Sequence, residues 1–338
     1  MRILLYARHR YPARRDDGTG LRPRPDPSGA PNHVNDLLAR GLAEQGHEVD
    51  YLLPAGFEGP LPEGVRHVTR VPTEVDLHHN LCVAGRPWVV TVHAYRPPAG
   101  YLDRYIDGAL VPDPARDARP PYELPRNGIC VSRTLARSFG GTRYVHNGVD
   151  PADFAFSETK GDYLLFMAGM QGPAYPDMYR RKGLELALEL SLEMGFELVV
   201  AGTARERAVT EQVAALCRRA GARYVGDVRG PRKAELLASA SALLFPTRLN
   251  EGCPLVIAEA LLSGTPVISS DRGSCPELIT SEVGFVCSDA AAYRRAIENV
   301  ASISPRACRA KALKDFHYRR MAADYVREYE SELHRNGS

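Results

Sequence analysis

Glu251 and Glu259 have seven residues between them, and their type and spacing indicate most clearly what this chain could bind. Glu251 lies in a loop-like stretch, and Glu259 lies in the apolar run 255–263, which we expect to be helical. The N-terminus of a helix attracts anions, because its first N–H groups lack intrahelical partners and the helix dipole is positive there. Each carboxylate can accept hydrogen bonds from sugar hydroxyls, and the N–H groups between them can hold phosphate. This layout is that of a nucleotide-sugar, which consists of a ribose, a diphosphate and a sugar.

The backbone N–H groups between the two glutamates are expected to complete this anion-binding site. The N–H groups of Cys253, Leu255 and Val256 can donate to phosphate oxygens, whereas Pro254 has no N–H. Two structural alternatives stand beside these roles. Glu259 can be an acid in an exposed first helical turn, where acids are favoured, and Glu251 can be an ordinary surface acid.

The stretch 250–260 resembles the E-x7-E motif of the retaining GT-B glycosyltransferases of family 4. Further stretches resemble other parts of that family and occur in its order: 1–6, 28–30, 42–49, 91–93, 147–150, 181–183 and 273–278. The resemblance therefore covers nearly the whole chain. It implies two Rossmann-like domains that face each other across a cleft, with ligand at the carboxyl ends of the strands.

The resemblance also implies roles for single residues. Glu259 is expected to accept hydrogen bonds from both ribose hydroxyls, and Glu251 to contact hydroxyls of the transferred sugar. Lys182 is expected to stabilise the negative charge that develops on the departing phosphate, which lowers the barrier more than it stabilises the ground state. His93, at the end of the apolar run 88–92, is expected to lie beside the sugar and the acceptor.

Two positions depart from the family pattern. Of the family's paired glycines only Gly29 is present, where it would let the backbone approach the donor phosphate or acceptor, and Ala30 replaces the second. The arginine that usually follows the glycine after the preceding strand is replaced by Met170. Arg180 and Arg181 are candidates to supply that charge, and we prefer Arg181 as the donor-binding residue.

The apolar pattern predicts an α/β chain in two halves. Residues 1–150 are expected to form an N-terminal acceptor-binding domain, residues 151–314 a C-terminal nucleotide-sugar-binding domain, and residues 315–334 a helix that, as in the family, crosses back to the first domain. Strands are predicted at 2–6, 49–53, 88–92, 163–167, 197–201, 222–225, 242–245, 266–269 and 284–286. Helices are predicted near 34–45, 182–195, 205–219, 231–240, 255–263 and 290–301.

Composition excludes several classes of protein. The 338 residues suggest two domains, and a formal net charge of +2 argues against nucleic-acid binding. The seven cysteines form no C-x-x-C pair, and no stretch is long and apolar enough to span a membrane, so we expect a cytoplasmic protein. The sequence contains no D-x-D, no H-E-x-x-H and no Cys/His cluster, so we expect no metal site and metal-independent chemistry.

The long segment 7–31 is rich in arginine, proline and glycine and is predicted to be a loop. Its arginines are either solvated or bind an anionic acceptor. We expect part of the loop to shape the acceptor pocket. Only five of the 43 basic residues are lysines. This arginine bias and the small size are similar to actinobacterial antibiotic-pathway glycosyltransferases of the avilamycin type.

The function expected from these observations is retaining transfer from a UDP-, dTDP- or GDP-sugar to a hydroxylated small molecule or oligosaccharide. UDP is the preferred nucleotide, and no cofactor other than this donor substrate is expected. Two alternatives are a nucleotide-sugar-binding subunit without turnover, and a GT-B-like epimerase or phosphorylase. Neither alternative enzyme accounts for Glu251 and Glu259 together as well as a glycosyltransferase does.

Overall fold

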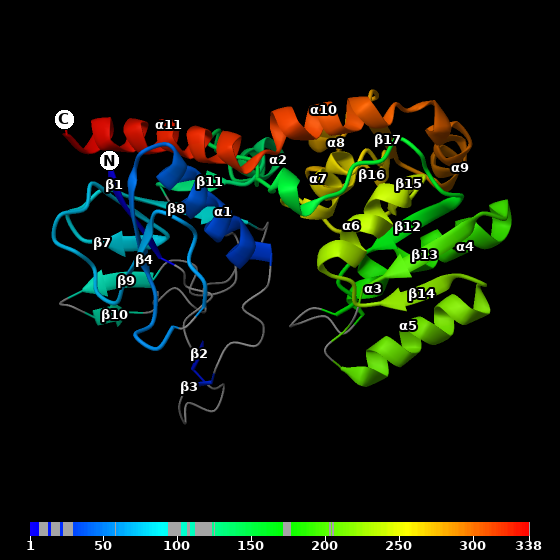
Figure 1. The fold of residues 1–338 in the computed structure, drawn as a ribbon, viewed down its shortest axis with the longest axis horizontal. Coiled ribbons are helices and arrows are strands. Elements are labelled where there is room, and N and C mark those ends of the chain that lie inside the picture. Colours follow the sequence, from blue (N-terminus) through cyan, green and yellow to red (C-terminus); the bar gives the residue numbers. More distant parts are fainter. Residues whose placement is uncertain are drawn as a thin grey trace. The chain divides into compact units, whose positions relative to one another are not determined.

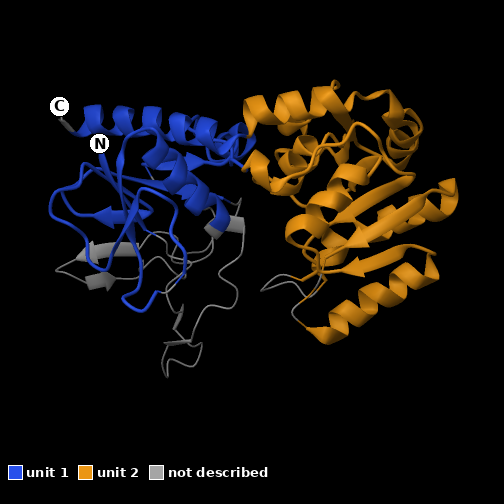
Figure 2. Cartoon of the chain, in the orientation of Figure 1, with its two compact units in different colours: residues 1–149, 317–338 blue, residues 150–316 orange. Residues whose placement is uncertain are grey.

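The computed structural model forms two compact units, of which the first combines the two ends of the chain. Unit 1 comprises residues 1–149 and 317–338, and unit 2 comprises residues 150–316 (Figure 2). The structure describes residues 1–6, 13–14, 21–22, 30–57, 59–93, 103–106, 109–111, 124, 126–171, 177–202, 204 and 206–337.

Unit 1 is built on a six-stranded parallel sheet with the order β11-β8-β6-β1-β4-β5 (Figure 1). Its strands are β1 (Arg2–Tyr6), β4 (Glu48–Leu52), β5 (Val65–Val68), β6 (Leu77–His79), β8 (Trp88–Val92) and β11 (Gly128–Cys130). Its helices are α1 (Ala30–Glu44), α2 (Arg133–Ser138) and α11 (Tyr318–Gly337). A smaller sheet contains β7 (Leu81–Val83), β9 (Asp103–Ile106) and β10 (Ala109–Val111), and β2 (Ala13–Arg14) pairs with β3 (Leu21–Arg22).

Unit 2 repeats this architecture with the strand order β14-β13-β12-β15-β16-β17, again in parallel. The strands are β12 (Tyr163–Met167), β13 (Glu197–Ala201), β14 (Arg223–Gly226), β15 (Ala242–Phe245), β16 (Val267–Ser270) and β17 (Gly284–Cys287). The helices are η3 (Pro151–Asp153), α3 (Met178–Arg181), α4 (Leu184–Met194), α5 (Arg207–Arg219), α6 (Gly230–Ser239), α7 (Leu255–Leu262), α8 (Cys275–Leu278), α9 (Ala290–Asn299), η4 (Val300–Ser302) and α10 (Pro305–Asp315).

Both sheets have the strand order of a Rossmann fold. In each unit the chain builds outward from a first central strand in one direction, then returns and builds outward in the other. In unit 2, alternate residues of β12 and β13, such as Phe166 and Val200, pack with α4, α5 and α9 in one hydrophobic cluster. The predicted fold class, two Rossmann-like domains, is confirmed.

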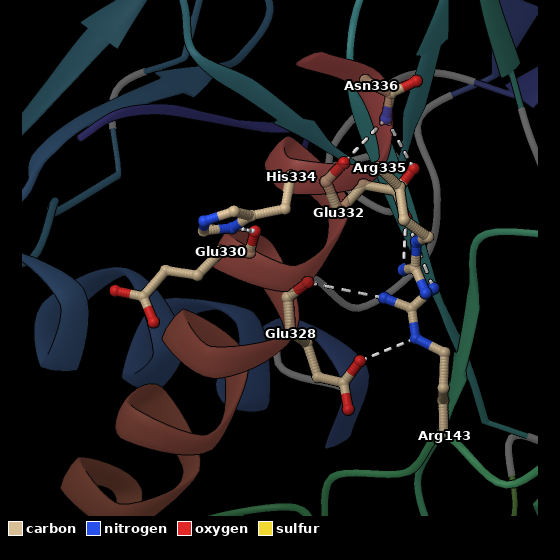
Figure 3. A network of polar contacts seen from close by, with 7 residues as sticks. All are labelled: Arg143, Glu328, Glu330, Glu332, His334, Arg335 and Asn336. Atoms are coloured by element: carbon tan, nitrogen blue, oxygen red, sulfur yellow. Dashed lines mark hydrogen bonds and ion pairs between the residues drawn. The ribbon is translucent and has the colours of Figure 1, made fainter. Parts of the chain in front are cut away.

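Helix α11 completes unit 1 through buried polar contacts as well as apolar ones. It packs along α1, and Arg143 donates from Nε to Glu328 at 2.6 Å (Figure 3). The Glu332 carboxylate is buried and accepts from Arg143 at 3.4 Å, from Arg335 at 2.7 Å and from Asn336 at 2.9 Å. A buried carboxylate needs such partners, because desolvating an unpaired charge is costly.

The helix predicted near 182–195 is α4, and it begins two residues later than predicted. The chain forms α3 up to Arg181 and begins α4 at Leu184, with Gly183 between them at a φ of +85°. This left-handed conformation ends one helix and starts the next, and it also places the backbone of Gly183 against another loop. A Cβ on Gly183 would lie 2.0 Å from the carbonyl oxygen of Pro246.

We predict that Gly183→Ala destabilises the protein more than the matched variant Gly195→Ala. Both glycines have positive φ, so both alanines incur the left-handed penalty of roughly 1–2 kcal/mol. A Cβ on Gly195 meets nothing within 4 Å, whereas the Cβ on Gly183 collides with Pro246 and adds about 1–3 kcal/mol. Urea denaturation followed by circular dichroism measures both effects. Equal denaturation midpoints for the two variants would contradict a close contact between Gly183 and the backbone of Pro246.

Candidate active site

The candidate site lies at the point in unit 2 where the strand order reverses. β12 and β15 are neighbours in the sheet, and the chain builds outward from them in opposite directions. In open α/β sheets, ligands bind outside the carboxyl ends of the strands at such a switch point. Lys182 belongs to the connection that follows β12, and Glu251 to the connection that follows β15.

Three connections pack together at this edge of the sheet. The Arg248 N–H donates to the Arg181 carbonyl at 2.8 Å, which joins the connection after β15 to the one after β12. The Ser274 N–H, in the connection after β16, donates to the Glu251 carbonyl at 2.9 Å. Gly273 has a φ of +57°, and a Cβ there would lie 2.3 Å from the Glu251 nitrogen. The connection after β16 therefore lies directly against the backbone of Glu251.

Lys182 and Glu251 form an ion pair in which neither side chain is a solvated surface group. Lys182 Nζ lies 2.7 Å from Glu251 Oε1, and the side chains are 19% and 13% exposed. The ammonium also lies 5.6 Å from the centroid of the Phe245 ring. The structure thus brings together two of the residues that the sequence analysis selected, and the alternative of Glu251 as an ordinary surface acid is wrong.

Glu259 forms a second ion pair, with a lysine that the sequence analysis did not select. Lys233 Nζ, on α6, lies 2.7 Å from Glu259 Oε1. Glu259 is 8% exposed and lies in the second turn of α7. The alternative of an exposed acid in the first turn is therefore wrong. The sequence gives no local signal for this pairing, because it depends on the contact between α6 and α7.

The N-terminus of α7 supplies the predicted anion donors. Pro254 is the residue before the helix, its side chain makes no capping hydrogen bond, and its carbonyl accepts from the Ile257 N–H at 3.2 Å. Leu255 and Val256 are the first two helical residues, whose N–H groups have no acceptor within an α-helix. Cys253 is half-buried, two residues before the helix begins. The phosphate contacts of all three N–H groups stay predictions.

Met170 is a core residue, and the candidate replacement arginines lie on α3. Met170 is fully buried in the hydrophobic cluster of unit 2. Arg180 Nε lies 3.1 Å from the Tyr179 hydroxyl oxygen and 3.4 Å from Glu185, and Arg181 Nε lies 3.6 Å from Asp177. None of these contacts tests the predicted role of Arg181 in donor binding.

His93 and Gly29 belong to unit 1. His93 is half-buried and directly follows β8. It lies near the fully buried His79, whose pKa is lowered to about 3 by burial and, to a smaller extent, by the charge of His93. His79 is held by the Tyr329 hydroxyl at Nδ1 and by the Thr91 hydroxyl at Nε2, at 2.6 and 2.7 Å. Gly29 and most of the segment 7–31 lie outside the described residues.

One cysteine lies close to the ion pair of Lys182 and Glu251. Cys275 is fully buried, and burial raises the pKa of its thiol to about 12, although the hydrogen bond with Ser269 opposes this increase. The thiolate is the nucleophilic form of cysteine. Cys275 is therefore a packing residue of the site and not its nucleophile.

Two other kinds of site are absent from the described residues. In the described ranges, no three or more His, Cys, Asp or Glu residues are grouped so that they can hold a metal ion. Among the helices of the described ranges, none is both long enough and apolar enough to span a bilayer.

Comparison with known proteins identifies the class of enzyme. Residues 177–302, which contain Lys182, Lys233, Glu251 and Glu259, match the family described as glycosyl transferases group 1. The phosphatidyl-myo-inositol mannosyltransferase of Mycolicibacterium smegmatis is 25% identical to this chain, over 72% of this chain and 73% of the mannosyltransferase. These matches support glycosyltransferase activity, and the two units have the GT-B fold.

Solved structures share the fold over nearly the whole length of this chain. AviGT4, a glycosyltransferase involved in avilamycin A biosynthesis, has a TM-score of 0.70 and 23% identity, and the match covers 100% of this chain and 98% of AviGT4. HepE of Anabaena, solved in complex with UDP, has a TM-score of 0.64 and 15% identity, and the match covers 98% of this chain and all of HepE. These likenesses agree with the two Rossmann-like units described above.

We predict that Glu259→Gln weakens the binding of UDP by about 1.5–3 kcal/mol, the range for hydrogen bonds to charged groups. The variant also leaves Lys233 without its carboxylate, so part of any effect can come from lost stability. The double variant Glu259→Gln with Lys233→Met removes both charges and serves as the control. We expect it to recover thermal stability but not UDP affinity, as measured by calorimetric titration. Unchanged UDP affinity in a folded Glu259→Gln protein contradicts the ribose role.

Proposed function

We propose that this glycosyltransferase moves a glycosyl group from a nucleoside-diphosphate sugar to a hydroxyl acceptor and retains the configuration at the anomeric carbon, as family 4 enzymes do. The observation that carries the proposal is the ion pair of Lys182 and Glu251 at the switch point of unit 2. It joins the proposed sugar-binding carboxylate to the proposed cation for the leaving phosphate. Glu259 and the first turn of α7 supply the remaining contacts, to ribose and to phosphate.

In the proposed mechanism, the acceptor oxygen attacks the anomeric carbon on the face from which the nucleoside diphosphate leaves. The bond between the anomeric carbon and the phosphate oxygen breaks, and the departing β-phosphate takes the proton of the acceptor hydroxyl. An ammonium has three N–H donors. Lys182 uses one on Glu251, which leaves the others for phosphate oxygens. A double displacement needs a carboxylate nucleophile beneath the sugar, and Glu251 is already assigned to sugar hydroxyls and paired with Lys182.

We propose UDP as the first nucleotide to test, followed by dTDP and GDP. HepE, which shares the fold, was solved with UDP and with UDP-glucose. We further propose an acceptor that is a hydroxylated small molecule or an oligosaccharide, bound by unit 1 with His93 beside it. A role in natural-product assembly is supported by the likeness to AviGT4 and by the arginine bias of the chain.

A donor and product assay tests this function. Thermal shift with UDP, dTDP, GDP and ADP selects the nucleotide, because a ligand that binds only the folded state raises its stability. The corresponding nucleotide-sugars are then incubated with a panel of hydroxylated acceptors, and NMR gives the anomeric configuration of the product. An inverted product contradicts retention. Release of nucleoside diphosphate without formation of a glycosylated acceptor points to hydrolysis. Binding of the nucleotide-sugar without any release of nucleoside diphosphate points to a binding subunit.

We predict that Lys182→Ala lowers turnover about 100-fold or more, comparable to the loss of one preorganised donor in an oxyanion site. The affinity for intact donor changes much less, because the charge that Lys182 stabilises grows as the phosphate departs. Lys160→Ala is a control for the loss of an ammonium elsewhere in unit 2, where Lys160 donates to the Ala238 carbonyl at 2.8 Å. A raised Michaelis constant with unchanged turnover in the Lys182 variant makes Lys182 a binding residue and moves the leaving-group role to Arg180 or Arg181.

We predict that removal of divalent metal leaves transfer essentially unchanged. The physical reason is that a lysine and a helix N-terminus can together stabilise the departing phosphate. Turnover is measured before and after treatment with a chelator. Activity that falls with the chelator and returns with Mg²⁺ or Mn²⁺ contradicts this prediction.

A further inference from the structure

A buried threonine lies beside the Lys182–Glu251 ion pair, and neither the sequence motif nor the proposed mechanism uses it. Thr247 follows β15 after one proline and is 1% exposed. Its hydroxyl oxygen Oγ1 lies 3.0 Å from Glu251 Oε1 and 3.1 Å from the Leu249 nitrogen. The Thr247 N–H in turn donates to the Phe245 carbonyl at 2.9 Å, which fixes the backbone at the end of the strand.

The direction of these hydrogen bonds follows from the chemistry of the groups. The Leu249 N–H can only donate, so the Thr247 oxygen accepts from it. A carboxylate can only accept, so the single proton of the Thr247 hydroxyl points at Glu251. The hydroxyl is therefore oriented from one side by a backbone donor and used on the other side by the carboxylate. Because threonine is β-branched, its χ1 angle is also restricted.

Both donors reach the same oxygen of the Glu251 carboxylate. Lys182 Nζ lies 2.7 Å from Oε1, and Thr247 Oγ1 lies 3.0 Å from it. Two donors on Oε1 restrain this oxygen and so limit the rotation of the carboxylate. We propose that Thr247 is a positioning residue that fixes the Glu251 carboxylate so that Oε2 is presented to the hydroxyls of the transferred sugar.

This proposal rests on the proposed sugar-binding role of Glu251. The two donors differ in how firmly they hold it. Lysine has a long, flexible side chain, and in the proposed mechanism its ammonium also serves the leaving phosphate. Thr247 is buried and anchored through Leu249, so its hold on the carboxylate does not depend on where the lysine ammonium goes. Glu251 therefore keeps its orientation while Lys182 follows the departing charge.

Thr247→Val tests the proposal, because valine keeps the shape and the β-branch but has no hydroxyl. UDP and UDP-glucose are the probes, and calorimetric titration gives the ratio of their dissociation constants. We expect Thr247→Val to weaken the binding of UDP-glucose about 10-fold relative to the binding of UDP, which corresponds to the loss of one hydrogen bond to a charged group. UDP alone lacks the sugar, so its affinity stays within about twofold of the unmodified protein.

Thr247→Ser is the matched control, since it restores the hydroxyl without the methyl group. We expect it to recover the unmodified ratio, and thermal unfolding of all variants excludes loss of folding as the cause. An unchanged ratio in Thr247→Val, or an equal loss of both affinities, overturns the positioning role. Glu251→Gln tests the sugar-binding role of Glu251 separately from the positioning role of Thr247. If this variant also leaves the ratio unchanged, the sugar-binding role of Glu251 is wrong, and the role of Thr247 falls with it.

Discussion

The close approach of two loops at the centre of the second sheet is the constraint on which the candidate site depends. The backbone of Gly183 lies so near the Pro246 carbonyl that a Cβ would stand 2.0 Å from its oxygen. Adjacent strands are roughly 4.8 Å apart, so connections that leave β12 and β15 start close together. Only a glycine in a left-handed conformation lets them stay in contact. Lys182, next to Gly183, can then reach Glu251 while both side chains remain mostly buried.

Charge balance is the second property that this arrangement provides. Two carboxylates near the binding place of a diphosphate would repel it, because like charges interact strongly where water is partly excluded. Here each carboxylate has a lysine partner, Lys182 for Glu251 and Lys233 for Glu259. A lysine ammonium keeps donors for further oxygens after it has formed one such contact. The pairs therefore neutralise the site without using up the groups that the proposed mechanism assigns to the substrate.

The sequence predicted those parts of the fold that follow from local patterns. Short apolar runs gave the strands 163–167 and 197–201 with their observed bounds. The strand Leu77–His79 was missed because two of its three residues are histidines that are buried through tertiary contacts. The helix Pro305–Asp315 was missed because its buried residues, Cys308 and Ala312, are small and give little apolar signal. The partners Lys233 and Thr247 were missed for a different reason, since each depends on how the chain packs around a glutamate.

Met170 stands where the family resemblance leads us to expect an arginine, and its burial explains why Lys182 is central to the proposed chemistry. Met170 is fully buried, and a Cβ on the neighbouring Gly202 would lie 3.0 Å from its terminal methyl group. A guanidinium at this position would be desolvated among apolar side chains, which costs several kcal/mol unless it gains a charged partner. The position therefore cannot supply a cation without rebuilding the core. In the proposed mechanism the charge comes instead from Lys182, which shares Oε1 of Glu251 with Thr247. Oε1 of Glu251 therefore contacts both the cation proposed for the leaving phosphate and the hydroxyl proposed to position the carboxylate.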